Sequence, residues 1–174
     1  MPIEKIVSIP DGVDATLEGT LLRVSGPLGT LERDLRFPQI SVTMSDDGIV
    51  IATDSEKKKI QAMCGTLESH ARNMTKGVTS GFEYHMKVVY SHFPIQLKVS
   101  GDRLDVVNFL GEKQPRYAKI LDGVSIRVGN DEVTVTGIDK EKVGNTAANI
   151  EHATRITKRD PRVFQDGIYI VERV

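Results

Sequence analysis

The chain has 174 residues, 23 Lys and Arg against 24 Asp and Glu, a formal net charge of −1, no Trp and 39% hydrophobic residues. This composition is enough for a hydrophobic core and excludes a disordered chain, and no stretch is apolar for long enough to cross a bilayer. The single cysteine, Cys64, excludes an intramolecular disulfide and a cysteine-based metal site. Because Met1–Lys5 does not resemble a secretory leader, we expect a cytoplasmic protein.

The small net charge gives no general preference for a polyanionic partner. The charges are uneven, however: residues 1–81 carry nine basic and eleven acidic side chains, whereas residues 82–174 carry fourteen and thirteen. Any site for a polyanion such as RNA is therefore expected in the second half.

The first elements predicted along the chain are the strands of a hairpin. Val13, Ala15 and Leu17 alternate with other residues, and Leu22 and Val24 continue the alternation. Successive side chains of a strand point to opposite faces, so this pattern is typical of strands with one buried face.

A glycine-rich segment, residues 25–29, follows these strands. A phosphate-binding loop would continue with a Lys–Ser/Thr pair that opens a helix, whereas Thr30–Arg33 has the pattern of a further strand. We interpret the segment as a hairpin connection.

A second hairpin is predicted downstream of the first. The run Ile40–Met44 alternates strictly, the Asp-Asp-Gly sequence at 46–48 is a turn signal, and the alternation resumes at Ile49 and Ile51. Asp and Gly tolerate the positive φ that short hairpin turns require.

A helix of about five turns follows, with Asp54 or Ser55 as the predicted N-cap. Its apolar residues recur at three- and four-residue steps, and this stripe consists of Ile60, Met63, Cys64, Leu67, Ala71 and Met74. Cys64 is interpreted as a core residue and not as a nucleophile. The run Lys57–Lys59 opposes the helix dipole, and we interpret it as a solvated face, with RNA contact as the alternative.

The pattern of residues 21–76 recurs in residues 103–158. Leu22 and Val24 have counterparts 82 residues later, and the strand at 40–44 has its counterpart 84 residues later, at 124–128. The later elements then repeat in order: a turn at 129–131, a strand with Val133 and Val135, an N-cap at Asp139 and a helical stripe of Val143, Ala147, Ile150 and Thr154.

This repeat predicts an α+β fold by tandem duplication, in which each unit is an antiparallel sheet packed on one helix. The predicted domains are 1–81 and 82–174, and the second unit is expected to open with a hairpin whose first strand contains Ile95, Leu97 and Val99. The strand-like run Phe82–Tyr90 follows the first helix, so we expect it to close the first unit, with Ser91–Pro94 joining the two.

The residues that would support catalysis do not converge. His70, His85, His92 and His152 are scattered, and they show no spacing typical of metal ligands. His70 and His152 fall at nearly corresponding points of the two helices, where we interpret them as repeated side chains at helix boundaries. The sequence therefore predicts no enzyme, no cofactor and no metal site.

Two basic segments of the second unit are the predicted RNA contacts. The first is Arg155–Arg162 at the end of the second helix. The helix dipole would favour Arg155 and Lys158 there whatever the function, but it does not explain Arg159 and Arg162, which lie around Pro161. The second is Gly111–Tyr117, which occupies the hairpin position of residues 26–30 in the first unit. Here Lys113 and Arg116 would reach phosphates while Tyr117 stacks on a base.

Four motifs in order along the chain resemble one known family, the universal large-subunit ribosomal protein L-six family in its archaeal and eukaryotic branch. These motifs are the hairpin Val24–Leu35, the segment Tyr84–Ile95, the segment Asn108–Lys113 and the C-terminal segment Arg159–Ile170. The resemblance covers essentially the whole chain. The C-terminal segment lacks the glycine- and lysine-rich tail of the bacterial branch, so the RNA contacts of bacterial members are not transferred to this segment.

The resemblance implies a structural protein that binds large-subunit ribosomal RNA near the base of the lateral stalk. The second domain would then lie close to the RNA loop engaged by translational GTPases, with neighbouring ribosomal proteins as further partners. By position, the RNA contacts would be Arg155, Lys158, Arg159, Arg162 and the hairpin around Lys113. The segment Tyr90–Phe93 would orient the domains, with His92 as a secondary RNA contact.

A second hypothesis is a tandem module for protein interaction, in which exposed strand edges pair with partner peptides. The near-zero net charge favours it. It predicts binding that survives nuclease and moderate salt, whereas RNA binding through phosphates weakens as salt rises.

Overall fold

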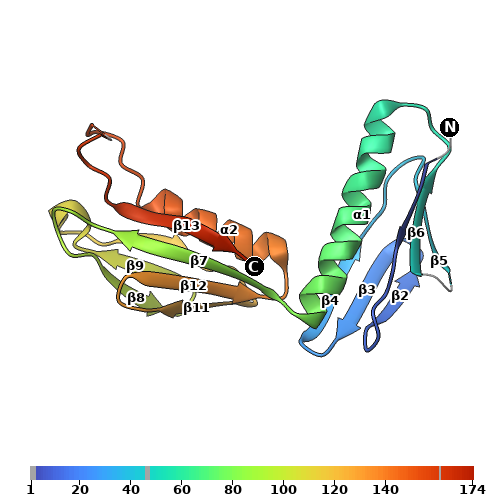
Figure 1. Ribbon diagram of the computed structural model, residues 1–174, viewed down its shortest axis with the longest axis horizontal. Coiled ribbons are helices and arrows are strands. Elements are labelled where there is room, and N and C mark those ends of the chain that lie inside the picture. The colour runs from blue at the N-terminus through green and yellow to red at the C-terminus, as the bar shows by residue number, and fades with distance from the viewer. Residues whose placement is uncertain (1–2, 46–47, 161) are drawn as a thin grey trace. The chain divides into compact units, whose positions relative to one another are not determined.

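A computed structural model describes residues 3–45, 48–160 and 162–174. The chain forms two compact units that divide between Gly81 and Phe82 (Figure 1). The turn predicted at 46–48 falls largely on Asp46 and Asp47, which lie outside the described residues. Among the helices described, none combines the length and the apolarity needed to span a membrane.

The described residues of the first unit form six strands and one long helix. Its elements are β1 (Ile3–Val7), β2 (Asp14–Glu18), β3 (Leu21–Gly26), β4 (Gly29–Asp34), β5 (Ser41–Ser45), β6 (Gly48–Thr53) and α1 (Lys58–Thr79). The strands form two antiparallel three-stranded sheets, in the orders β1-β6-β5 and β2-β3-β4. Both sheets contact α1, which covers them from one side (Figure 1).

The core of the first unit contains the residues that the sequence patterns select. Leu22, Val24, Ile49 and Ile51 are fully buried, and they pack with Cys64 and the rest of the apolar stripe of α1. Cys64 is therefore a core residue, as predicted. Its sulfhydryl donates to the carbonyl of Ile51, and burial raises the pKa of the thiol, so the side chain is unsuited to nucleophilic chemistry.

The second unit repeats this order and adds a strand at its end. Its elements are β7 (Phe82–Val89), β8 (Gln96–Ser100), β9 (Arg103–Val107), the short 3-10 helix η1 (Phe109–Gly111), β10 (Arg116–Lys119), β11 (Val124–Val128), β12 (Glu132–Gly137), α2 (Lys140–Ala153) and β13 (Gly167–Arg173). The sheets have the orders β10-β9-β8 and β11-β12-β7-β13, and all their pairs are antiparallel. Both units thus have the α+β fold predicted from the duplication.

Strand β7 lies in the second unit, so its predicted place in the first unit is wrong. Tyr84 pairs with Val135 of β12, and the apolar face of β7 packs into the same core as α2. β7 pairs with β12 just as β1 pairs with β6, which makes β7 the counterpart of β1. Residues 91–94 therefore do not join the units: they follow the end of β7 that is remote from Phe82, about 25 Å along the strand.

The N-cap of the helix matches the prediction in the second unit only. Asp139 caps α2, because its carboxylate accepts hydrogen bonds from the backbone N–H groups of Glu141 and Lys142. In the first unit neither Asp54 nor Ser55 is the N-cap: α1 begins at Lys58, after Lys57. The hydroxyl of Ser55 instead accepts from the N–H of Lys57, in the turn before the helix.

The two helices differ in length, and this separates the two histidines that sequence analysis compared. α1 spans 22 residues and α2 spans 14. His70 lies in the middle of α1, whereas His152 lies in the last turn of α2. The interpretation of both as helix-boundary residues is therefore wrong for His70.

The glycine-rich segment is a hairpin connection, as predicted, and it is packed against the end of α1. Gly26 pairs with Gly29 across the turn, and the N–H of Leu28 donates to the carbonyl of Val78 at 3.0 Å. A Cβ on Gly26 would lie 2.7 Å from Val78 Cγ2 and 2.8 Å from Val78 O. Only glycine fits between the hairpin and the helix at this point.

Replacing Gly26 by Ala should therefore lower the free energy of unfolding of the first unit by about 1–3 kcal/mol, the usual cost of overpacking. Gly65→Ala is the control, because a Cβ at that helical position meets open space. It should stabilise the unit by about 0.5–1 kcal/mol, since Ala is the better helix former. Urea unfolding followed by far-ultraviolet circular dichroism measures both, and equal effects would contradict the packing argument.

Candidate nucleic-acid interface

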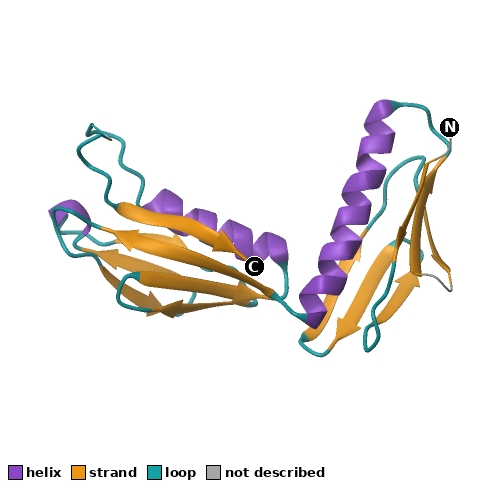
Figure 2. Ribbon diagram, viewed as in Figure 1, coloured by secondary structure: helices purple, strands orange, loops and turns teal. Residues whose placement is uncertain are grey.

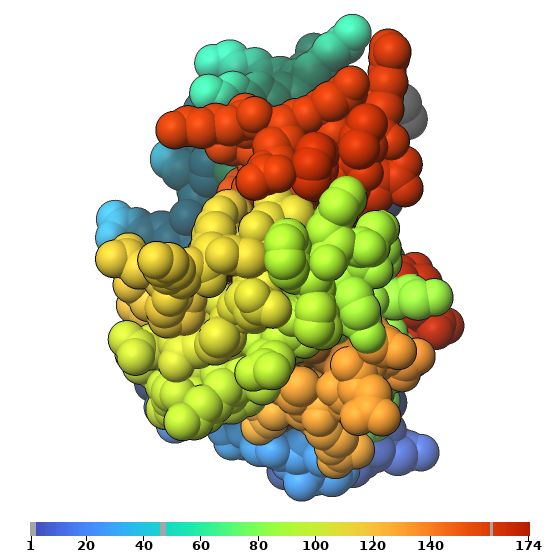
Figure 3. Space-filling model, turned by 90° about the vertical axis from the view of Figure 1, so that its left-hand side faces the viewer, coloured from blue at the N-terminus to red at the C-terminus, as the bar shows by residue number. Residues whose placement is uncertain are grey.

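Three connections of the second unit meet at one end of it (Figure 2). They are residues 90–95 between β7 and β8, 108–115 between β9 and β10, and 154–166 between α2 and β13. We call this region the loop end, and Figure 3 shows its surface, where the red and yellow segments adjoin. The first two connections contact each other, because the side chain of Asn108 donates to Pro94 O at 3.1 Å and the ring of Phe93 lies over Gly111.

A buried carboxylate ties the first connection to the third. Asp166 is 1% exposed, and it accepts hydrogen bonds from the backbone N–H groups of Ser91 at 3.0 Å and His92 at 3.3 Å. Its other oxygen lies 3.0 Å from Nδ1 of His92, which donates because a carboxylate only accepts. Burial raises the pKa of Asp166, but these hydrogen bonds together outweigh it and hold the pKa below the ordinary value of 3.8.

Replacing Asp166 by Asn should lower the free energy of unfolding of the second unit by about 1–3 kcal/mol near neutral pH, since hydrogen bonds to ionised groups are the stronger ones. Because the folded-state pKa is depressed, this contribution is complete above pH 3.8 and is lost as the pH falls through the folded-state pKa. Denaturant midpoints of both proteins should therefore converge in acid. A difference that stays constant down to about pH 2 would contradict the assignment.

An aromatic stack includes His92 and contacts Arg159, both of which are predicted RNA contacts. The imidazole of His92 stacks on Phe164 with the ring centroids 4.4 Å apart, and the guanidinium of Arg159 lies 4.6 Å from the Phe164 centroid. Such cation–π contacts are worth about 0.5–1 kcal/mol at exposed sites. Asp166, His92, Phe164 and Arg159 thus form a continuous chain of contacts from the core to the surface.

Arg116 ties the second connection to the third. Its Nε and Nη2 donate to both oxygens of Glu112, at 2.8 and 2.6 Å, while Nη1 donates to the carbonyls of Ala153 and Arg155, at 3.1 and 3.0 Å. The guanidinium also lies 4.4 Å from the centroid of the Phe109 ring. The hydrogen bonds from Arg116 hold the pKa of Glu112 below its usual range. Four of the five N–H donors of Arg116 are therefore engaged within the protein.

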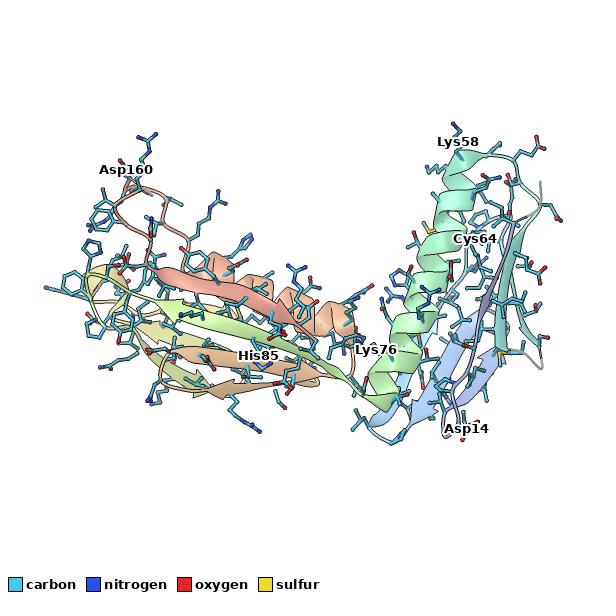
Figure 4. The ribbon with its side chains drawn as sticks, viewed as in Figure 1. Asp14, Lys58, Cys64, Lys76, His85 and Asp160 are labelled. Carbon is cyan, nitrogen blue, oxygen red and sulfur yellow. The ribbon has the colours of Figure 1, made fainter. Side chains whose placement is uncertain are left out.

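The predicted basic segment lies after the second helix and not within its end. α2 ends at Ala153, with Thr154 as its C-cap, so Arg155 and Lys158 belong to the loop. Arg155, Lys158, Arg159 and Arg162 are all exposed on it. Asp160, at its tip (Figure 4), accepts from the N–H of Arg162 at 2.9 Å. Pro161, the predicted helix stop, lies outside the described residues.

The remaining predicted contacts are divided between two faces. Lys113 is exposed on the connection 108–115. It therefore shares the loop end with the connection 154–166, which we call the basic loop. Tyr117 follows Arg116 on β10 and therefore points to the opposite face of the sheet, where it is 61% exposed. There Arg103 lies 5.3 Å from the centroid of its ring. RNA contacts by His92 and Tyr117 stay predictions.

Sequence reasoning missed the residues that hold the loop end together, which are Glu112, Phe164 and Asp166. Phe164 and Asp166 stand in the C-terminal motif already singled out, but their residue types gave no sign of a partner. Among the residues that the structure describes, no group of three or more His, Cys, Asp or Glu side chains is placed to hold a metal ion. The loop end thus presents exposed cations on connections that internal hydrogen bonds tie together.

A family model described as Ribosomal protein L6 matches residues 9–81 and 93–167, which together make up most of the chain. The chain belongs to the ribosomal protein L6 family. The two matched segments fall in the two units, in keeping with the internal duplication.

Individual relatives agree with the family model. The chain is 61% identical to the large ribosomal subunit protein uL6 of Methanospirillum hungatei, over 99% of this chain and 98% of the relative. It is 51% identical to the protein of the same name from Methanothrix thermoacetophila, over 98% and 99%, and 48% identical to that of Methanocella arvoryzae, over 99% of both. As a member of the ribosomal protein L6 family, the chain is a structural component of the large ribosomal subunit in the cytoplasm and not an enzyme.

Proposed function

We propose that this protein binds large-subunit ribosomal RNA near the base of the lateral stalk, close to the RNA loop engaged by translational GTPases. The second unit makes the main contact, through the cations of the loop end: Lys113, Arg155, Lys158, Arg159 and Arg162. The location at the stalk base rests on the family resemblance. The RNA contact rests on the structure of the loop end.

The observation that carries the proposal is that contacts within the second unit hold the basic loop in place. A loop with several exposed cations would normally lose conformational entropy on binding. Here Arg116 holds the carbonyl of Arg155, and Phe164 and Asp166 hold the other side of the loop. The loop backbone at Arg155 and the guanidinium of Arg159 are therefore positioned before RNA arrives, which lowers the entropy cost of binding.

The acidic side chains at the loop end do not oppose this reading, because each has an internal partner. Glu112 pairs with Arg116, Asp166 is buried beneath Ser91 and His92, and Asp160 accepts from a backbone N–H of its own turn. The near-zero net charge of the chain therefore conceals a locally basic surface.

Pairing of a partner peptide with strand edges has less support at this end. β13 is an edge strand, but the N–H groups of Ile168 and Ile170 donate to side chains of Thr154 and Glu151. A register shift between Ile170 and Glu172 interrupts the strand further along. The edge of β13 beside the loop end is therefore not free for a regular added strand.

The test is chemical footprinting of archaeal large-subunit ribosomal RNA with the full-length protein. We expect protected nucleotides at the stalk base and near the GTPase-associated region, and an affinity that falls as salt rises. In sedimentation, ribonuclease should release the protein from large subunits. Protection confined to other regions, or binding that ignores both salt and ribonuclease, would refute the proposal.

A further inference from the structure

A cavity of about 400 Å³ lies beside the basic loop, between the end of α2 and the start of β13. It is lined by Glu151, His152, Thr154, Arg155, Ile156, Phe164, Gln165 and Tyr169. Its size is within the range of roughly 300–1,000 Å³ that is usual for pockets that bind small ligands.

Tyr169 supplies a flat aromatic wall whose position is fixed. Its hydroxyl donates to the carbonyl of Gln165 at 3.1 Å, and its ring packs over Gly167, where a Cβ would lie 2.9 Å from the hydroxyl oxygen and 3.0 Å from Cζ. The residue is nevertheless 44% exposed. A fixed and accessible aromatic ring is the usual platform on which proteins stack an unpaired base.

The polar groups of the cavity suit a nucleotide. Arg155 provides a guanidinium that can reach a phosphate, and the amide of Gln165 carries both a donor and acceptor for the edge of a base. One oxygen of the acidic residue, Glu151, is engaged, because Oε1 accepts from the N–H of Ile170 at 3.2 Å. The hydroxyl of Thr154 accepts from the N–H of Ile168 in the same way.

We infer that this cavity binds a single unstacked nucleobase of the ribosomal RNA, with the base on Tyr169, its edge against Gln165 and a flanking phosphate on Arg155. The inference rests on the proposed RNA-binding function and deepens it. The basic loop contacts phosphates without regard to sequence, whereas the cavity adds a contact to one base. A peptide side chain is the competing occupant, and the edge of β13 that would hold its backbone is already used by Thr154 and Glu151.

The test uses full-length protein and naked archaeal large-subunit ribosomal RNA, so that no other ribosomal protein is present. Tyr169→Leu keeps an apolar side chain but removes the aromatic face, and it should weaken binding roughly 5- to 150-fold, as loss of one stacked base does. Tyr169→Phe keeps the ring and should stay within about threefold of the wild type. Val171→Ala is the matched control: this exposed residue of the same strand lies outside the cavity lining, and its loss should have no effect.

Base-specific chemical probing separates stacking from a loss of structure. The wild type should protect the Watson–Crick edge of one unpaired nucleotide, and Tyr169→Leu should restore its reactivity while the other protections remain. If Tyr169→Leu binds naked RNA like the wild type, the cavity does not hold a base. That result would leave the RNA-binding function itself intact, whereas failure of the wild type to bind RNA would remove both.

Discussion

Replacing Arg155, Lys158, Arg159 and Arg162 together by Ala should abolish stable binding to large-subunit ribosomal RNA while the second unit remains folded. All four side chains are exposed on one loop, so their removal leaves the core unchanged. The largest structural loss is the contact of Arg159 with Phe164, worth about 0.5–1 kcal/mol. Each phosphate contact adds about 0.7–0.9 to the slope of log affinity against log salt, so the slope should fall by roughly 3.

Filter binding of the full-length variants over a range of salt concentrations measures this effect. The control carries Ala at Lys87, Arg127, Lys140 and Lys142, which are exposed cations elsewhere in the second unit. It has the same net charge as the test variant, so bulk electrostatic attraction is equal in the two proteins. If the test variant binds with normal affinity and an unchanged salt slope, or if both variants lose affinity equally, the loop does not make the contact.

Replacing Arg116 by Ala should destabilise the second unit by about 2–4 kcal/mol, which corresponds to a fall in Tm of roughly 10–25 °C for a domain of this size. The side chain is only 28% exposed, and its removal leaves the carbonyls of Ala153 and Arg155 without their donor and Glu112 without its partner. Arg116→Lys should recover less than half of the loss, because an ammonium group lacks the planar fork that reaches three partners at once.

The four tyrosines of the chain, Tyr84, Tyr90, Tyr117 and Tyr169, all lie in the second unit, and there is no Trp. Near-ultraviolet signals of tyrosine therefore follow the unfolding of that unit alone. Arg127→Ala removes the same charge at an exposed position of β11 and should change the Tm by no more than a few degrees. An equally mild effect of Arg116→Ala would show that its hydrogen bonds contribute little.

RNA binding distinguishes a positioning role of Arg116 from the direct contact expected from the sequence. If Arg116 positions the basic loop, Arg116→Lys should weaken RNA binding at a temperature where the variant is folded, yet keep the salt slope of the wild type. A phosphate contact by Arg116 would be retained by Lys, because Lys also binds phosphate as a point charge, and the affinity would then change little.

The strands, the helices and the core could be predicted because their signals are local. Alternation marks a half-buried strand wherever it occurs, and the stripe from Ile60 to Met74 identifies the buried face of a helix without knowledge of its partner. The assignment of β7 failed for the complementary reason. A strand such as Phe82–Val89 has the same pattern in either unit, and only its pairing with β12 and β13 decides where it belongs.

The sequence predicted the cations of the candidate site but not the contacts that hold its connections together. Exposed cations can be recognised from residue type, so the basic loop and Lys113 could be named from the sequence. Arg116 was assigned to RNA in the same way, yet its partners include two backbone carbonyls that lie 37 and 39 residues further along the chain. Carbonyl oxygens are present at every residue, so no sequence pattern reveals which of them will accept a hydrogen bond.

The side chains of Thr154 and Glu151 accept hydrogen bonds from the outward N–H groups of Ile168 and Ile170, and this has a consequence for the protein before it joins a ribosome. A newly synthesised copy must persist for a time without RNA, at concentrations where exposed strands of neighbouring copies could polymerise. Tyr169 and Val171 expose apolar surface on β13, an edge strand of its sheet, which favours such association. Because Thr154 and Glu151 already accept hydrogen bonds from these two N–H groups, the strand of another copy cannot pair with them, which opposes that self-association.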